Sequence, residues 1–219
     1  MIIYFSATGN CKHTAKVLAQ KTEDEAKSIL EFMNSREKAD FRDENRLGII
    51  APTYGWRLPS IVREFIQNTE ITVSENTYVY FVSTYGTSPG ATVHEMRRLL
   101  REKNIEIDSV YSIRMPDTWT PIFNLSDARK VEAINAAAES EIAQTAESIL
   151  AGDRRKRMKR QLPAFTLAIA AMVYDGMRRT ASLYVESNCT GCGLCERKCP
   201  VKAIEIKDGR PVWIKQQCT

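Results

Sequence analysis

The chain has 219 residues, of which 43% are hydrophobic, and its 31 Lys and Arg against 27 Asp and Glu give a net charge of +4. This composition is ordinary for a globular protein, and the length predicts one medium domain with a small one beside it. The longest apolar stretch, 13 residues from 162 to 174, excludes a membrane-spanning helix, which needs about 20 residues.

A phosphate-binding turn is predicted at the start of the chain. Residues 2–5 form a short apolar run typical of a buried strand, and a helical pattern follows residue 10. The helix N-terminus offers unpaired N–H groups and a positive dipole end to an anion, and a glycine lets the backbone approach it closely. The dinucleotide fingerprint and the nucleotide-triphosphate loop are excluded, because Gly9 stands alone and no Gly-Lys pair follows it. A polar turn without a ligand is the alternative.

Four more strands alternate with helical segments. They are expected at residues 29–32, 47–51, 78–83 and 110–114. The third and fourth strands of the chain lead into polar, glycine-containing loops at 52–59 and 84–90. Strands that alternate with helices predict a doubly wound α/β fold with a parallel sheet, and such sheets bind ligands at the carboxyl ends of their strands.

The second half of the chain is expected to be mainly helical before its last segment. A long helix should run from a cap at Ser126 to Leu150. The residues expected to face inward are Val131, Ile134, Ala138 and Ile149. A further helix is expected within 161–183, and a hairpin with an Asp-Gly turn is expected around 207–210.

Five of the six cysteines lie near the C-terminus, four of them in one dense run. Cys189, Cys192, Cys195 and Cys199 follow the spacing C-x2-C-x2-C-x3-C-P, which is typical of an iron–sulfur cluster. Zinc is the alternative, but zinc sites usually include His or pair two separated C-x2-C units. Clustered cysteines fit a metal better than disulfides and, with no secretory signal visible, predict a reducing, cytoplasmic location.

The same run raises the question of its fourth ligand. In two-cluster ferredoxins the last Cys of such a run ligates the other cluster, which takes its remaining ligands from a second run. Because Cys218 stands where a second run would begin, we expect this sequence to be a C-terminal truncation of a two-cluster protein. A one-cluster protein that uses Cys199 or Cys218 as its fourth ligand is the alternative.

Several motifs occur together in a characteristic order. They are Y-F-S-A-T-G-N, P-T-Y-G-W, S-T-Y-G-T-S-P-G, M-P-D and the cysteine run. In this order the chain resembles the bacterial and archaeal flavodoxin–ferredoxin fusion proteins of the EFR type, over essentially its whole length. The resemblance implies a flavodoxin-like domain at 1–152 with five parallel strands in the order 2-1-3-4-5. A basic and helical linker would follow at 153–183, and a small, incomplete α+β ferredoxin domain of the bacterial type at 184–219.

The resemblance also implies the cofactor-binding residues. One loop would bind the FMN phosphate, a second would cover one side of the flavin, and a third would hold its pyrimidine edge and other side. These residues are Ser6, Thr8, Gly9, Asn10 and Cys11, then Thr53, Tyr54, Gly55 and Trp56, then Thr84, Tyr85, Gly86 and Ser88. The 4Fe–4S ligands, for two clusters in the full-length protein, would come from Cys189, Cys192, Cys195, Cys199 and Cys218.

Three residues near these loops have more than one interpretation. Cys11 stands where flavodoxins usually place Thr or Ser, and because a thiol is a weak donor we expect somewhat weaker FMN binding. A redox role for Cys11 is the alternative, since helix N-termini lower the pKa of a thiol. Arg57 either stabilises a reduced flavin or lies solvated on the surface. Asp117 is interpreted as a turn residue that borders the flavin site at most.

The expected function is electron transfer between FMN, which accepts one or two electrons, and 4Fe–4S clusters, which carry one. No paired carboxylates or triad spacing indicate acid–base catalysis. An FMN-dependent reductase of a quinone, iron chelate or small organic acceptor is one alternative, and a non-catalytic redox sensor is another. The expected partner is a redox protein such as a ferredoxin or reductase. The basic run 154–160 is a solvated linker face or docks an acidic partner, and nucleic acid is not expected.

Overall fold

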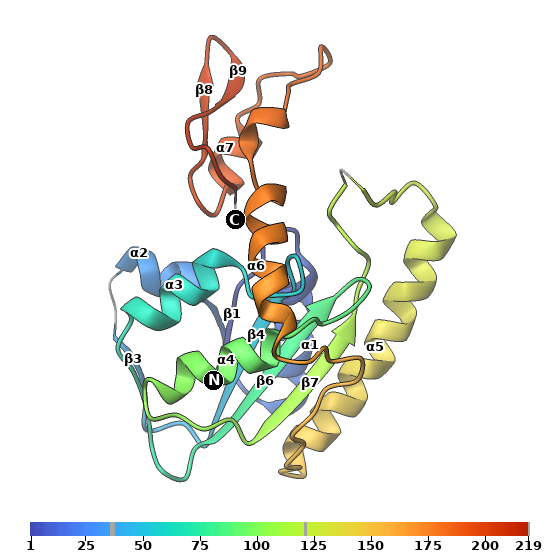
Figure 1. Ribbon diagram of the computed structural model, residues 1–219. Coiled ribbons are helices and arrows are strands. Elements are labelled where there is room, and N and C mark those ends of the chain that lie inside the picture. Colours follow the sequence, from blue (N-terminus) through green and yellow to red (C-terminus); the bar gives the residue numbers. More distant parts are fainter. Residues whose placement is uncertain (36–37, 121, 219) are drawn as a thin grey trace.

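The computed structural model describes residues 1–35, 38–120 and 122–218 (Figure 1). Its main element is a five-stranded parallel sheet in the order β2-β1-β4-β6-β7. Counted along the chain, these five strands stand in the order 2-1-3-4-5, so the predicted flavodoxin-like topology is confirmed. The strands are β1 (Ile2–Tyr4), β2 (Ala26–Ser28), β4 (Arg46–Pro52), β6 (Tyr78–Tyr85) and β7 (Ser109–Arg114).

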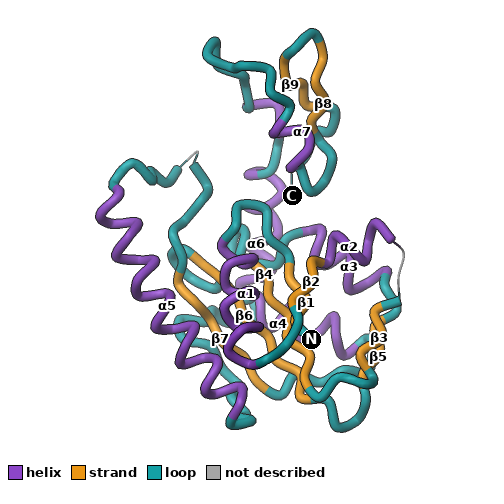
Figure 2. The backbone as a smooth tube through the Cα atoms, turned by 180° about the vertical axis from the view of Figure 1, so that it is seen from behind, coloured by secondary structure: helices purple, strands orange, loops and turns teal. Residues whose placement is uncertain are grey.

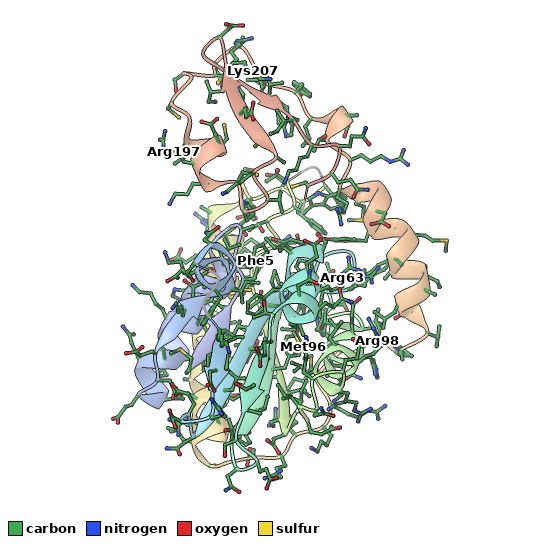
Figure 3. The ribbon with its side chains drawn as sticks, turned by 90° about the vertical axis from the view of Figure 1, so that its left-hand side faces the viewer. Phe5, Arg63, Met96, Arg98, Arg197 and Lys207 are labelled. Atoms are coloured by element: carbon green, nitrogen blue, oxygen red, sulfur yellow. The ribbon has the colours of Figure 1, made fainter. Side chains whose placement is uncertain are left out.

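Helices cover both faces of the sheet (Figure 2). Ile50 and Val82 belong to the core cluster shared with α1 and α5, whereas Ile49 and Phe81 belong to the cluster shared with α2, α3 and α4. Because neighbouring residues of a strand point to opposite faces, both must be apolar in a sheet covered on two sides. Met96 of α4 is fully buried in the second of these layers (Figure 3). The helices are α1 (Asn10–Thr22), α2 (Ile29–Ser35), α3 (Ser60–Asn68), α4 (Thr92–Arg101) and α5 (Ala128–Leu150).

The second strand lies earlier than the sequence predicts. Residues 29–32 form the start of α2, and the strand is the preceding segment, Ala26–Ser28. Ile29 and Phe32 are both buried, and their spacing of three places them on one helix face. A short apolar run fits a strand and a buried helix equally well, which is why the prediction was wrong. A separate two-stranded parallel pair, β3 (Ala39–Phe41) with β5 (Ile71–Val73), was not expected.

The long helix α5 is confirmed, with corrections at its start. Its N-cap is Asp127 and not Ser126, and the Asp127 carboxylate accepts a hydrogen bond from the Lys130 N–H. Val131 and Ile134 are only half-buried, whereas the expected inward residues farther along the helix are buried. The buried residues of this helix are Ala138, Ile142, Thr145, Ala146 and Ile149. The contact with the sheet and α1 therefore involves the second half of α5, because the first half projects beyond them (Figure 2).

The basic run lies along an edge of the sheet. The Val110 N–H of β7 donates to the Arg155 carbonyl at 2.8 Å, and the Arg155 N–H donates to the Ser109 hydroxyl at 2.8 Å. Farther on, the Lys159 carbonyl accepts from the Ser112 hydroxyl at 3.4 Å. Positive side chains at an exposed sheet edge oppose pairing with another chain.

The segment after this edge contains the expected helix and hairpin. It comprises α6 (Thr166–Met177), a 3₁₀ turn η1 (Thr180–Ser182), α7 (Leu194–Lys198), β8 (Ile204–Lys207) and β9 (Arg210–Trp213). Asp208 and Gly209 both have positive φ, 50° and 74°, as the predicted Asp-Gly turn requires. The small α+β unit of α7, β8 and β9 lies beyond the carboxyl ends of the parallel strands (Figure 1). None of the described helices is long and apolar enough to cross a membrane.

Candidate functional site

The loop between β1 and α1 has the form of an anion cradle. Gly9 is the N-cap of α1 with φ +111°, and a Cβ at this position would meet nothing within 4 Å. The Gly9 N–H donates to the Ser6 hydroxyl at 3.1 Å, and none of the described side chains caps α1. The first-turn N–H groups of a helix have no intrahelical acceptor. This loop therefore presents amides and the helix dipole to open space, which fits a phosphate.

The segment after β7 holds this loop in place. Asn10 Nδ2 donates to the Pro116 carbonyl at 2.9 Å, and the Thr8 and Thr118 hydroxyls are 2.9 Å apart. Sequence reasoning missed Pro116 and Thr118, although the M-P-D motif marked their segment. Asn10 and Thr8 thus tie the loop after β1 to the segment after β7, although β4 and β6 lie between these two strands in the sheet.

Cys11 is directed into the protein core. It is 1% exposed, and its Sγ lies 3.1 Å from the Thr84 hydroxyl at the end of β6. Burial raises the pKa of the Cys11 thiol to about 12, although the bond to Thr84 acts in the opposite direction. The thiol is therefore neutral at physiological pH, which contradicts the alternative of a helix-activated redox cysteine. The group that remains for a phosphate at this position is the backbone N–H.

The loop after β4 is a tight two-residue turn. Tyr54 and Arg57 exchange backbone hydrogen bonds of 3.0 and 3.1 Å, and between them Gly55 and Trp56 have φ values of +53° and +64°. Positive φ at both central positions is the geometry of a type I′ turn. Trp56 is 42% exposed, whereas Tyr54 packs against the core cluster beneath the loop. The two aromatic side chains thus lie in different surroundings.

Arg57 is neither solvated nor free, so the surface interpretation was wrong. Its guanidinium forms an ion pair of 2.5 Å with Glu95 of α4, which also accepts the Leu58 N–H at 2.9 Å. The Arg57 and Glu95 side chains are 13% and 2% exposed. Glu95 was missed, although it stands on the apolar face of α4 with Met96, where an acid needs a partner.

The end of β6 and the loop after it pack against the second loop and against Asp117 of the segment after β7. The Thr53 hydroxyl is 2.8 Å from Ser83 Oγ, and the Ala91 N–H donates to the Trp56 carbonyl at 2.9 Å. A Cβ on Gly86 would lie 2.2 Å from Asp117 Oδ2, so only glycine allows this approach. Burial raises the pKa of Asp117.

The remaining predicted residues of this loop have structural contacts. Thr84 and Tyr85, expected in a loop, are the buried last residues of β6. The Ser88 hydroxyl accepts from the Gly90 N–H at 3.1 Å and donates to the Arg160 carbonyl at 3.3 Å. Ser88 thus joins the third loop to the end of the basic run. Two cavities, of about 570 and 290 Å³, lie on α4 and beside α5, away from the three loops.

The cysteine run has backbone features suited to sulfur ligation. Gly191 and Gly193 have φ near +70°, and the Ala203 N–H donates to Cys199 Sγ at 3.2 Å. Hydrogen bonds to sulfur tune the potentials of iron–sulfur clusters. The Leu194 N–H, and then the Thr190 hydroxyl, lower the pKa of Cys192. Among the described residues no three His, Cys, Asp or Glu are gathered closely enough to hold a metal, so the fit rests on the thiolate donor set.

The end of this run lies close to the flavodoxin-like body. Val201, two residues after Cys199, packs against the core cluster that also contacts Tyr54. Burial, and then the charges of Cys11, Tyr174 and Cys218, raise the pKa of Tyr54. The cysteine-rich unit and the second loop are therefore near neighbours.

The family comparison agrees with this geometry. The family described as "Flavodoxin domain" matches residues 1–144. The chain belongs to the flavodoxin family. In this flavodoxin-family chain, a "4Fe-4S binding domain" matches residues 183–205, so a ferredoxin-type motif follows the flavodoxin domain. The two together identify an electron-transfer flavoprotein with FMN and 4Fe–4S as its cofactor types.

Solved structures similar to this flavodoxin-family chain include three from bacteria. A flavodiiron core from Synechocystis is 15% identical with a TM-score of 0.41, and the match covers 68% of this chain and 36% of that one. A Fusobacterium nucleatum flavodoxin bound to flavin mononucleotide is 9% identical with a TM-score of 0.42, covering 68% and 95%. A two-electron reduced Megasphaera elsdenii flavodoxin is 17% identical with a TM-score of 0.40, covering 66% and 96%. The comparison with curated protein sequences found no match to the chain.

Proposed function

We propose that this protein transfers electrons between FMN, held by the three loops, and a 4Fe–4S cluster, held by the cysteine run. The observation that carries the proposal is that Val201, of the cysteine-rich unit, and Tyr54, of the second loop, both pack against the core cluster of the flavodoxin-like domain. Two redox groups at short range in one chain convert two-electron into one-electron transfer. The proposed division is 1–152 for FMN, 153–183 for the linker and 184–219 for the iron–sulfur unit.

In this proposal the chain supplies binding and orientation. The phosphate lies against the N–H groups at the start of α1, where Gly9 leaves open space. Thr8 and Asn10 hold that loop through residues 116–118. Trp56, exposed at its turn, covers one side of the flavin, and Gly86 lets the third loop approach Asp117. Cys11 contributes its N–H.

The same proposal assigns the cluster to four thiolates. Cys189, Cys192 and Cys195 provide three of them, and the fourth comes from Cys199 or Cys218. Cys199 accepts the Ala203 N–H, whereas Cys218 is exposed and its N–H donates to the Arg178 carbonyl at 2.7 Å. Iron content in Cys199→Ala and Cys218→Ala decides between them, because loss of the true ligand reduces the iron retained after reconstitution.

The deciding experiment is the content of FMN and iron per chain after anaerobic reconstitution. We expect about one FMN and about four iron atoms. Riboflavin serves as the control ligand, because it lacks the phosphate and should bind much more weakly. FMN without stable iron would limit the proposal to the flavodoxin domain, and absence of FMN would overturn it.

A redox protein with an acidic surface is the proposed partner. Charges of the run 154–160 lie along the β7 edge, and this run ends at the third loop through Arg160 and Ser88. Electrostatic docking predicts that electron exchange with an acidic plant-type ferredoxin slows as ionic strength rises. A rate independent of salt would contradict this partner class.

A further inference from the structure

Tyr174, near the end of α6, is the most enclosed aromatic side chain of the linker. It is 2% exposed, and its hydroxyl accepts the Ser60 N–H at 2.9 Å. Ser60 is the first residue of α3, which has no side-chain cap of its own. A residue of the linker therefore caps a helix of the flavodoxin domain, a contact that the linker loses if it moves away.

Three arginines surround the Tyr174 ring. The guanidinium carbons of Arg57, Arg63 and Arg178 lie 6.0, 5.6 and 5.1 Å from its centroid. They come from the second loop, from α3 and from the residue after α6, and Figure 3 shows Arg63 on the side of the molecule along which α6 runs. The buried Nε atoms of all three have no hydrogen-bond partner among the described residues. The ring face thus stabilises cations that hydrogen bonds do not fully satisfy.

The same tyrosine contacts the turn proposed to cover the flavin. A Cβ added to Gly55 would lie 3.4 Å from Tyr174 Cβ, which is ordinary van der Waals contact. At the end of the same turn, Arg57 is paired with Glu95, so the turn is fixed from two sides. The position of Tyr174 therefore depends directly on the position of the second loop.

The residues after Tyr174 connect it to the cysteine-rich unit. The Arg178 carbonyl accepts the Cys218 N–H at 2.7 Å, and Arg178 Nη2 donates to Gln217 at 2.6 Å. Thr180 Oγ1 donates to the Lys215 carbonyl at 2.6 Å, and Lys215 Nζ donates to the Val201 carbonyl at 2.6 Å. A continuous set of contacts thus leads from Gly55 through Tyr174 and Arg178 to Val201, just after the cysteine run. Figure 1 shows α6 on the path of the chain from the sheet to the cysteine-rich unit.

We infer that Tyr174, held among Arg57, Arg63 and Arg178, is the latch that docks the iron–sulfur unit against the flavin loop. It is a positioning residue, since its contacts are to protein groups and not to a cofactor. The docking role stands on the contacts alone, and its consequence for electron transfer rests on the proposed function. Loss of the ring removes three cation–π contacts and one hydrogen bond at once.

Hydrogen exchange of the full chain tests the latch without reference to activity. In Tyr174→Leu the amides of α6 and of residues 215–218 should exchange about tenfold faster or more, because the undocked population rises. Tyr174→Phe keeps the ring and should change exchange mainly at Ser60. Tyr184→Leu is the matched control, since Tyr184 is 80% exposed. Exchange at the wild-type rate in Tyr174→Leu, or an equal increase in Tyr184→Leu, would overturn the latch.

A second variant and a second readout complete the test. If Tyr174→Leu does not fold, Arg63→Met removes one cation and should speed exchange in α6 about threefold, while unchanged exchange would overturn the proposal. In the reconstituted protein, laser-flash kinetics should show loss of the fast transfer phase in Tyr174→Leu and its recovery in Tyr174→Phe, at unchanged FMN and iron content. Retention of that phase in Tyr174→Leu overturns the positioning role. Absence of transfer in the wild type contradicts the proposed function, while the exchange result still decides the latch.

Discussion

Glu95 of α4 and Arg57 of the second loop form a 2.5 Å ion pair, and Glu95 is almost completely withdrawn from solvent. The same carboxylate accepts the Leu58 N–H and lies 3.9 Å from the Arg63 guanidinium. Glu95 therefore fixes the end of the second loop and the start of α3, and it contacts two of the three arginines around Tyr174. A buried charge of this kind is costly to leave without its partner.

Replacing Glu95 should test this dependence. Glu95→Ala leaves Arg57 buried without a counter-ion, so we expect the free energy of unfolding to fall by about 3–5 kcal/mol. Urea denaturation followed by circular dichroism measures the change. Glu102→Ala, which removes a half-exposed acid at the C-cap of the same helix that is paired with Arg98, should cost less than about 1 kcal/mol. Equal losses in the two variants would show that burial of the pair is unimportant.

The close approach of Gly86 to Asp117 gives a second prediction. Gly86→Ala would place a methyl group 2.2 Å from Asp117 Oδ2, and the strain should lower the free energy of unfolding by about 1–3 kcal/mol and weaken FMN binding. Thermal denaturation and FMN titration measure both effects. Gly176→Ala is the control, because a Cβ there meets nothing within 4 Å and the site is helical, so stability should rise slightly. Unchanged stability and FMN binding in Gly86→Ala would contradict the close approach of Gly86 to Asp117.

Burial of Cys11 predicts a specific alkaline effect on stability. Its folded-state pKa of about 12 exceeds its ordinary value of 9.0, so above pH 9 the unfolded chain releases a proton that the folded protein keeps. The protonated thiol therefore adds its full contribution to the free energy of unfolding below about pH 9. That contribution is lost as the pH rises to about 12, by up to about 1.4 kcal/mol for each pH unit.

Comparison with Cys11→Ala measures this contribution together with its coupling to Tyr54, whose pKa is raised by burial and then by the Cys11 charge; Tyr78, Tyr80 and Tyr85 have no such coupling to Cys11. Urea unfolding of the FMN-free proteins between pH 8 and about 11 should show the stability difference in favour of the wild type shrinking as pH rises. A difference that stays constant with pH would mean that the Cys11 thiol is accessible to solvent in the folded state.

Gly191 offers a test in the cysteine run. A Cβ at this position would lie 2.4 Å from the Gly209 carbonyl of the hairpin turn, and its φ of +69° disfavours any L side chain. We expect Gly191→Ala to retain much less iron after reconstitution, with FMN content unchanged. Gly176→Ala, on the linker helix, should retain iron at the wild-type level. Normal iron content in Gly191→Ala would show that cluster assembly does not depend on the close approach of Gly191 to the hairpin turn.

Local patterns in the sequence determined most of the strands and turns of this protein. The apolar runs at 47–51, 78–83 and 110–114, the glycine turn after β1 and the Asp208-Gly209 hairpin act through short-range sterics, and all are observed. The cysteine spacing likewise indicated an iron–sulfur motif. The predictions of a strand at 29–32 and of a cap at Ser126 were wrong. A short apolar run fits either a strand or a helix, and in a cluster of capping residues more than one residue can cap the helix.

Only the tertiary structure decided which residues from distant segments meet. The thiol of Cys11 turned toward Thr84, Arg57 was neutralised by Glu95, and Tyr174 was enclosed by arginines from three segments. Each of these outcomes depends on how the burial of a polar or aromatic group is compensated. The partner of Arg57 lies 38 residues away, and two of the three arginines around Tyr174 lie 111 and 117 residues away. Such partners leave no periodic signal, because the energy of a buried charge depends on where the chain folds and not on its neighbours in sequence.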